Sequence, residues 1–400
     1  MLRLLTFIGT GNYLETTYTL GEAASPTDLV SAALLTWNPE AVCTVFATVQ
    51  ALDAKQSLLG ERLPNANIVV VPTGSTKDEL WSVFSTIVDS VDEGDSIIVD
   101  VTHGFRSQPM LLLMAVMFLR TAKHCTVEGV YYGAYDSARP ETTPVFDLTP
   151  FIDMVDWSHA VEAYFASGST AGLKSLTRTT KPKPGEDVDL SRRSSIVTEL
   201  HSLSQNLMTS RTGKVGEAAR RVTSAIAAAK KGKQEPRPIA YLLDRLEEKV
   251  SQLALAASNQ TNEALLENHY QQVCWLIDHG HYNAAISLGR ELYVTYFLLE
   301  AYPEADYKDK VKRSEAETWL GYFSRPMTDA LVGAPLPLDA VKWQKHLRFY
   351  GILSDRRNDV QHAGMRPQEL DYDKIVGVCG ELRTEFAELL RLSPSSPKKN

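Results

Sequence analysis

Short apolar runs alternate with amphipathic segments along the first 150 residues of the chain. The runs are rich in β-branched residues and predict strands at residues 2–8, 41–47, 67–72, 96–101 and 127–135. Helical spacing of apolar residues predicts a helix over 77–91, and the segment 109–122 is so apolar that we expect a buried crossover helix. Strands joined by such short helical connections run parallel, so we expect a Rossmann-like, doubly wound α/β sheet.

The pattern changes in the second half of the chain. Residues 151–166 predict a helix, and 167–191, rich in Ser, Thr, Gly, Lys and Pro without a sustained period, predict a connector. From residue 192 the period is helical up to residue 393, and residues 394–400 should form a frayed tail. We therefore expect an α/β domain over 1–166 followed by an all-α domain over 192–393.

Composition narrows the class of protein. Of the 400 residues, 44% are hydrophobic and 22% are charged, which is typical of a folded globular chain and excludes disorder as its main state. No apolar run approaches the roughly 18 residues of a membrane span, and the first residues run directly into a predicted strand. We therefore expect a cytoplasmic protein without a membrane segment.

The net charge of −8 conceals an asymmetry between the two halves. Residues 1–190 carry 12 Lys and Arg against 23 Asp and Glu, whereas residues 191–400 carry 29 against 26. An acidic chain is a poor general coat for DNA or RNA, because such coats need a basic surface that releases counterions. A local site for a polyanion stays open in either half.

Two groups of residues at predicted strand ends could bind a ligand. Gly9-Thr10-Gly11-Asn12-Tyr13 ends the first strand, where glycines let backbone N–H groups approach a phosphate, although a tight turn accounts for them equally well. Thr102-His103-Gly104-Phe105-Arg106 ends the fourth strand and suits phosphate and base contacts. In the alternative, Asp100 and Arg106 form an internal ion pair and His103 caps a helix.

Two other strand ends are expected to line the same rim. Thr48 ends the second strand, and Thr73 with Gly74 ends the third. The Gly9 segment lacks the full GxGxxG fingerprint and the chain has no GKS or GKT, which argues against nicotinamide and ATP chemistry. The four widely spaced cysteines are expected to be buried, reduced and structural, and no ligand spacing supports a metal site.

One constellation stands out in the helical half, Arg356-Arg357-Asn358-Asp359-Val360-Gln361-His362. Asn358 and His362 are four residues apart and share a helix face, and Arg357 is long enough to reach toward them. Gly364 and Pro367 predict that the helix ends nearby, which leaves His362 close to an exposed C-terminal end. The alternative is an ordinary surface helix end with a solvated arginine.

These segments together resemble one family closely. An N-terminal Rossmann-like half with strand ends IGTGNY and DVTHGFRS, the PVFDLTPF segment at 144–151 and an all-α half carrying RNDVQH are similar to the CRISPR-associated ribonucleases of type III systems. Those proteins fuse a CARF sensor domain, here 1–166, to a HEPN nuclease domain, here 192–393. The resemblance covers nearly the whole chain.

The resemblance implies a mechanism. Members are homodimers, with higher oligomers left open, whose paired CARF domains bind a cyclic oligoadenylate. For this chain we expect cyclic tetra-adenylate ahead of cyclic hexa-adenylate. Paired HEPN domains cut single-stranded RNA without a metal, the 2′-hydroxyl attacking the adjacent phosphate to leave a 2′,3′-cyclic phosphate.

The resemblance also assigns residues. The catalytic residues would be Arg357, Asn358 and His362, with Arg356 as an RNA or dimer contact. Histidine moves protons near neutral pH, and arginine stabilises the charge that develops on phosphorus. The cyclic ligand would contact Gly9, Thr10, Gly11, Asn12, Tyr13, Thr48, Gly74, Thr102, His103, Gly104, Phe105 and Arg106.

Two other functions remain open at this point. The chain could be a ligand-sensing regulator whose helical half only dimerises or binds a partner, without nuclease activity. The sensor could also degrade its own cyclic ligand, which is compatible with the nuclease function.

Overall fold

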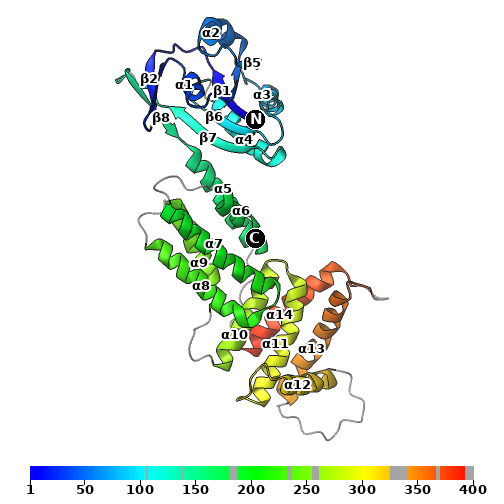
Figure 1. Cartoon of the computed structure of the whole chain (residues 1–400). Coiled ribbons are helices and arrows are strands. Elements are labelled where there is room, and N and C mark those ends of the chain that lie inside the picture. Colours follow the sequence, from blue (N-terminus) through cyan, green and yellow to red (C-terminus); the bar gives the residue numbers. More distant parts are fainter. Residues whose placement is uncertain are drawn as a thin grey trace. The chain divides into compact units, whose positions relative to one another are not determined.

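The computed structural model describes residues 1–104, 107–136, 138–179, 187–231, 237–254, 261–324, 340–365 and 370–391 (Figure 1). The chain divides into two compact units, Met1–Val155 and Asp156–Asn400. The division falls within one long helix, Thr149–Ser167. The predicted tail, 394–400, lies outside the described residues.

The N-terminal unit is built on one eight-stranded sheet. Its strands are β1 (Leu2–Ile8), β2 (Thr16–Leu20), β3 (Ala23–Thr27), β4 (Val42–Ala47), β5 (Asn67–Val70), β6 (Ser96–Asp100), β7 (Thr126–Gly133) and β8 (Thr142–Asp147). They follow the order β3-β2-β8-β7-β6-β1-β4-β5. The five strands from β7 to β5 run parallel to one another, which confirms the predicted doubly wound centre.

The sheet is mixed, however, because three strands are added that the sequence did not predict. β8 runs antiparallel to β7, and β2 pairs parallel with β8 and antiparallel with β3. These strands have few apolar residues, and β3 contains Pro26, which a strand at the edge of a sheet tolerates. Their pairing therefore leaves little trace in the hydrophobic pattern.

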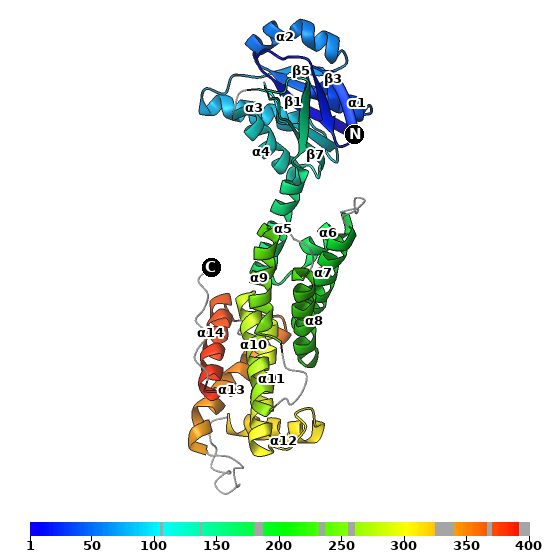
Figure 2. The ribbon, with the colours of Figure 1, turned by 90° about the vertical axis from the view of Figure 1, so that its left-hand side faces the viewer.

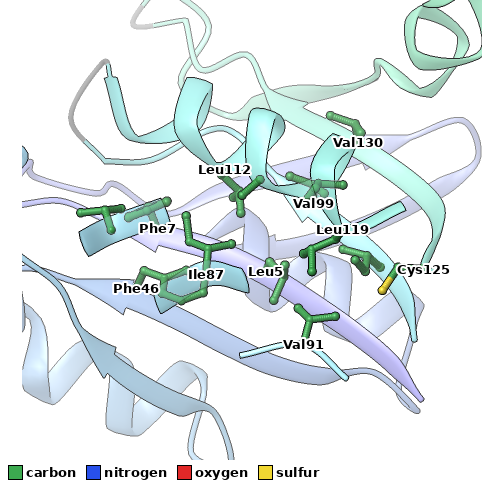
Figure 3. Close-up of a cluster of buried hydrophobic side chains, with 14 of the residues drawn as sticks. Leu5, Phe7, Phe46, Ile87, Val91, Val99, Leu112, Leu119, Cys125 and Val130 are labelled. Atoms are coloured by element: carbon green, nitrogen blue, oxygen red, sulfur yellow. The ribbon is translucent and has the colours of Figure 1, made fainter. Parts of the chain in front are cut away.

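Helices cover both faces of the sheet. They are α1 (Val30–Trp37), α2 (Val49–Arg62), α3 (Lys77–Asp89) and α4 (Ser107–Ala122). α3 and α4 bury side chains such as Ile87 and Leu112 against Leu5 and Phe7 of β1, in the cluster that Figure 3 shows. α1 and α2 form a second cluster with the alternate residues of β1 and β4. Two cores on opposite faces are what alternation of side chains along a buried strand produces.

α4 differs from the prediction of a buried crossover helix. Leu112, Ala115 and Leu119 are buried against the sheet, but Met110, Met114 and Phe118 on another face are 61%, 57% and 49% exposed. The helix is apolar around most of its circumference, and this unit covers only one side of it. The prediction is therefore wrong for the exposed face.

The second unit is helical, as expected. Its helices are α5 (Thr149–Ser167), α6 (Ala171–Thr179), α7 (Asp187–Met208), α8 (Thr212–Lys230), α9 (Arg237–Ser251), α10 (Asn262–Asp278), α11 (Tyr282–Ala301), α12 (Lys310–Phe323), α13 (Ala340–Gln361) and α14 (Tyr372–Leu389). α7 packs beside α8, and α10 beside α11 (Figures 1 and 2). α11 also packs against α12, α13 and α14.

The predicted connector is wrong in part. Ala171–Thr179 forms α6, whose Leu173 is buried, and α7 begins at Asp187, inside the predicted connector. All four cysteines, Cys43, Cys125, Cys274 and Cys379, are buried and free, as expected. No helix within the described ranges combines the length and apolar character that crossing a membrane requires.

Candidate functional site

The residues after β1 and β6 come together at one edge of the sheet. β1 and β6 are parallel neighbours, so the loops that follow them leave the same edge. The Tyr13 hydroxyl donates to the carbonyl of Gly9 at 3.1 Å and accepts from its N–H at 2.9 Å. The Tyr13 ring meets the His103 ring edge-on, with 4.5 Å between centroids. The two groups of residues singled out in the sequence therefore form one cluster.

The backbone of the two loops also lies close together. A Cβ atom added to Gly9 would lie 3.4 Å from the Cα of Gly104. Gly104 has a φ of +106°, a conformation that residues with side chains rarely adopt. Glycine at both positions keeps the loops in contact, while Thr10, Gly11 and Asn12 are exposed to solvent.

His103 presents a neutral imidazole to this cluster. Burial lowers its pKa, although the nearby Asp100 carboxylate acts in the opposite direction. Its Nε2 atom is shielded from solvent and has no hydrogen-bond partner among the described residues. A buried nitrogen without a partner is a group that a ligand can satisfy.

Asp100 and Thr102 fix the start of the β6 loop. The buried Asp100 carboxylate accepts hydrogen bonds from the Thr6 hydroxyl at 2.6 Å and from the Thr102 N–H at 2.9 Å. The Thr102 hydroxyl in turn accepts from the Gly133 N–H at 2.8 Å. Phe105 and Arg106 lie outside the described residues, so both the ligand contact and the Asp100–Arg106 pair stay predictions.

The residues expected to complete the rim have partners within the chain. The buried Thr48 hydroxyl accepts from the Ala51 N–H at 3.2 Å and caps α2. The Gly74 and Ser75 N–H groups donate to Glu79 at 3.0 and 2.8 Å, and the contacts of this carboxylate with Ser75, Thr73 and Gly74 lower its pKa. Glu79 therefore occupies the amides that a ligand phosphate would need, and a ligand reaching Gly74 has to displace it.

Lys55 is a cation in this region that was not predicted from the sequence. Its Nζ lies 4.9 Å from the centroid of the Tyr13 ring. Lys55 lies on α2 seven residues after the Thr48 cap, hence two turns along the same helix face. That spacing from a strand end is the signal that could have identified it.

The RNDVQH motif lies at the C-terminal end of α13. The His362 N–H donates to the Asn358 carbonyl at 3.1 Å, and α13 ends at Gln361, followed by left-handed residues at Ala363 and Gly364. The predicted helix end at Gly364 is confirmed, whereas Pro367 lies outside the described residues. Asn358 and His362 are exposed, as expected for a helix end.

The two arginines of the motif have different neighbours. Arg356 forms an ion pair with Asp355 at 2.9 Å. Arg357 donates to the side-chain oxygen of Asn358 at 3.3 Å, and within the described residues no hydrogen bond joins it to His362. Asp359 is buried, whereas Asn358 and His362 are exposed. Arg357, Asn358 and His362 are therefore accessible in a single chain but are not assembled into a closed site.

The described residues offer no group of ligands for a metal ion. No cluster of three or more His, Cys, Asp or Glu side chains among them is placed to hold an ion.

Comparison with known proteins finds a family match for the N-terminal unit. Residues 3–136 match the family described as CRISPR system endoribonuclease Csx1, CARF domain. A curated relative, the CRISPR-associated protein MJ1674 of Methanocaldococcus jannaschii, is 31% identical over 111 residues. That match covers 27% of this chain and only 18% of the relative.

Among solved structures, one similar chain is Enterococcus italicus Csm6 bound to cyclic hexa-2′-fluoro-hexa-dAMP. It aligns over 98% of this chain and 95% of its own, with 14% identity and a TM-score of 0.41.

Proposed function

We propose that this chain, a CARF-containing type III CRISPR protein, is an endoribonuclease of antiviral defence that a cyclic oligoadenylate activates. The CARF match covers the two loops that meet at the sheet edge, and their contact through Tyr13 and His103 is the observation that carries the proposal. In this proposal residues 1–166 sense the ligand and residues 192–393 form a HEPN nuclease.

The sensor site is suited to a phosphate-rich ring. The Gly9–Tyr13 loop includes exposed residues and Lys55 offers an ammonium group. His103 offers an Nε2 atom that has no hydrogen-bond partner among the residues that the structure describes. Backbone N–H groups and one or two cations can hold phosphates without a generally basic surface, which agrees with the acidic first half. Cyclic tetra-adenylate is the proposed ring, with cyclic hexa-adenylate as the alternative.

The exposed face of α4 supports a homodimer. Met110, Met114 and Phe118 lie along this face, and the Phe118 ring meets Phe84 of α3 edge-on at 5.6 Å. Trp81 of α3, 59% exposed, extends the apolar surface through its contact with Phe84. A second copy of the chain would cover this surface, and an isologous contact would place two sensor loops around one ring.

The proposed nuclease site needs both chains. Arg357 and His362 are accessible and unconnected in one chain, so a second copy can bring in the complementary pair. His362 would exchange protons with the attacking 2′-hydroxyl or the leaving 5′-oxygen, Arg357 would stabilise the developing phosphorane charge, and Asn358 would orient Arg357. The bond broken is the P–O5′ bond, and the product is a 2′,3′-cyclic phosphate.

The test is cleavage of labelled single-stranded RNA in EDTA, with and without each cyclic oligoadenylate. We expect cleavage only with the ring, and Ala at His362 or Arg357 should lower the rate by about 10²- to 10⁴-fold. Arg348→Ala, which removes another exposed arginine of α13, is the matched control and should keep full activity.

Two results would contradict the nuclease assignment: full activity of His362→Ala, or complete loss of wild-type activity in EDTA. Ring binding by calorimetry is measured separately, and one ring per two chains is expected, with weaker binding by Lys55→Ala. Ring binding without RNA cleavage would favour the regulator over the nuclease.

A further inference from the structure

The helical unit contains a cavity that the proposed function does not use. It has a volume of about 370 Å³ and lies among the start of α8, α10, α11 and the segment that leads into α12. Its polar lining includes His269, Glu291, Thr295, Tyr307, Lys308 and Arg313. None of these residues belongs to the sensor loops or to the RNDVQH motif.

Positive charge predominates in this cavity. Arg313 is held in place by donating to the Thr295 hydroxyl at 3.0 Å and to Glu291 at 2.7 Å. Glu291 is the one carboxylate in the lining, and it also pairs with Arg290 at 2.7 Å, so two guanidinium groups share its charge. Lys308 is exposed, and within the described residues no carboxylate pairs with it; its Nζ lies 5.2 Å from the Tyr307 ring centroid.

The start of α8 adds to the positive end of the cavity. α8 begins at Thr212, and no side chain caps it. A Cβ atom on Gly213 would lie 3.4 Å from the Lys308 Nζ, so the ammonium lies against the first turn of the helix. A helix N-terminus carries partial positive charge, and an anion between the two groups would relieve their repulsion.

His269 supplies an independent indication of a ligand. Its side chain is buried, with the residue only 4% exposed, and its ring meets Tyr307 edge-on at 5.8 Å between centroids. In the part of the chain that the structure describes, its Nε2 has no hydrogen-bond partner. Burial, with Arg313 and Lys308 nearby, lowers its pKa to about 4, so the imidazole is neutral at pH 7. His269 lines the cavity, and a buried polar atom without a partner is a group that a ligand can satisfy.

We propose that this cavity binds a phosphate group carried by a nucleotide, with Lys308 and the N-terminus of α8 meeting the phosphate and His269 donating to one of its oxygens. The volume lies within the roughly 300 to 1,000 Å³ of small-ligand sites, and the Tyr307 ring provides an aromatic wall for a base. The nucleotide is either free or part of an RNA chain, since both carry the same phosphate chemistry.

The test measures the NMR signal of His269 in the full-length chain. Histidine labelled with ¹³C at Cε1 is observed by NMR, and the signal absent from His269→Gln identifies His269. Adenosine 5′-monophosphate, inorganic phosphate and a short single-stranded RNA with 2′-O-methyl groups, which cannot be cleaved by 2′-attack, are then titrated separately. We expect a saturable shift of the His269 signal, with tighter binding of the monophosphate nucleotide or the RNA than of inorganic phosphate.

Two lysines form a matched pair for the control. Lys308→Ala should weaken the nucleotide by about tenfold or more, since it removes a charge-assisted contact. Lys312→Ala removes the same charge from a lysine that does not line the cavity and whose Nζ lies 5.3 Å from the Tyr302 ring centroid. The affinity of this variant for the nucleotide should be unchanged.

The outcomes separate clearly. No saturable shift with any probe, or equal losses in the two lysine variants, would overturn the proposed site. Equal affinity for inorganic phosphate and the nucleotide would overturn the nucleotide assignment. Tighter binding of the RNA than of the free nucleotide would support the site and identify an RNA chain as the source. Because the readout requires neither cleavage nor a cyclic oligoadenylate, failure of the proposed nuclease would not affect it.

Discussion

Replacing Gly104 by alanine tests the geometry of the sensor site most directly. The φ of +106° costs an alanine about 1 to 2 kcal/mol or more. Its Cβ would also lie 2.9 Å from the Phe7 Cβ and 2.9 Å from the Gln108 Oε1. Phe7 and Gln108 are both buried, so neither can move freely, and such overpacking typically costs about 1 to 3 kcal/mol. We therefore expect Gly104→Ala to destabilise the N-terminal unit by about 2 to 5 kcal/mol.

Gly94→Ala is the matched control for this change. Gly94 has a φ of +76°, but a Cβ atom there would meet nothing within 4 Å. Only the backbone cost of about 1 to 2 kcal/mol should appear. The difference between the two variants therefore isolates the contact between the Gly104 loop and Phe7.

Hydrogen exchange of the full-length chain, followed peptide by peptide, provides the assay. The slowest amides of β1 and β6 report the unfolding free energy of the N-terminal unit, without interference from the helical unit. If Gly104→Ala costs no more than Gly94→Ala, the loop does not lie against Phe7 and the assembled sensor site is refuted.

Three further predictions follow from the same structure. Met114→Asp should convert the proposed dimer to monomer in sedimentation velocity, because it would bury an unpaired carboxylate in the interface. Val311→Asp on α12, also at an exposed apolar residue, should not, and a dimer in both variants would contradict the proposed α4 interface. The pKa of His269 is about 4 in the folded chain and about 6.5 in the unfolded chain, so protonation favours unfolding. The free energy of unfolding, measured by urea titration, should therefore fall by about 3 kcal/mol between pH 6.5 and pH 4, and His269→Gln should reduce this fall. In cleavage-deficient His362→Ala, saturating RNA should tighten the cyclic ligand by the same factor by which the ligand tightens RNA, typically about 5- to 150-fold; equal ring affinities with and without RNA would exclude a shared conformational equilibrium.

The centre of the sheet and the sensor loops could be predicted from the sequence because both follow from strong local rules. Short apolar runs such as residues 2–8 and 96–101, bounded by turn residues, predict buried strands, and parallel strands place their carboxyl ends at one edge. This brings Tyr13 and His103 together although ninety residues separate them. Strands β2 and β3 were not predicted, because their sequences, TTYTL and AASPT, lack an apolar pattern and the strands are held by backbone pairing.

The contacts at the candidate site that the sequence did not predict depend on packing between distant segments. Lys55 is an ordinary surface lysine until the Tyr13 loop folds beneath it. Glu79 is an ordinary residue in the first turn of α3, yet its carboxylate fills the amides of Gly74 and Ser75. The spacing of Lys55 from Thr48 gives its helix face but not its contact with Tyr13, and the contact of Glu79 with the Gly74 and Ser75 amides has no sequence signature.

The α4 helix has more apolar surface than one chain buries. Its pattern is apolar on both the face that holds Leu112 and the face that holds Met114, which is why a buried helix was expected. Only the first face is buried within the chain. Burying apolar side chains away from water is favourable, and a large exposed apolar patch often marks an interaction surface. The exposed apolar face of α4 therefore argues for a partner that covers it. The same reasoning applies to Arg357 and His362, which are accessible and which no hydrogen bond joins within the described part of the chain. A symmetric dimer would cover the exposed apolar surface of α4 and would also complete the catalytic pair that we propose, and for this reason we propose the dimer.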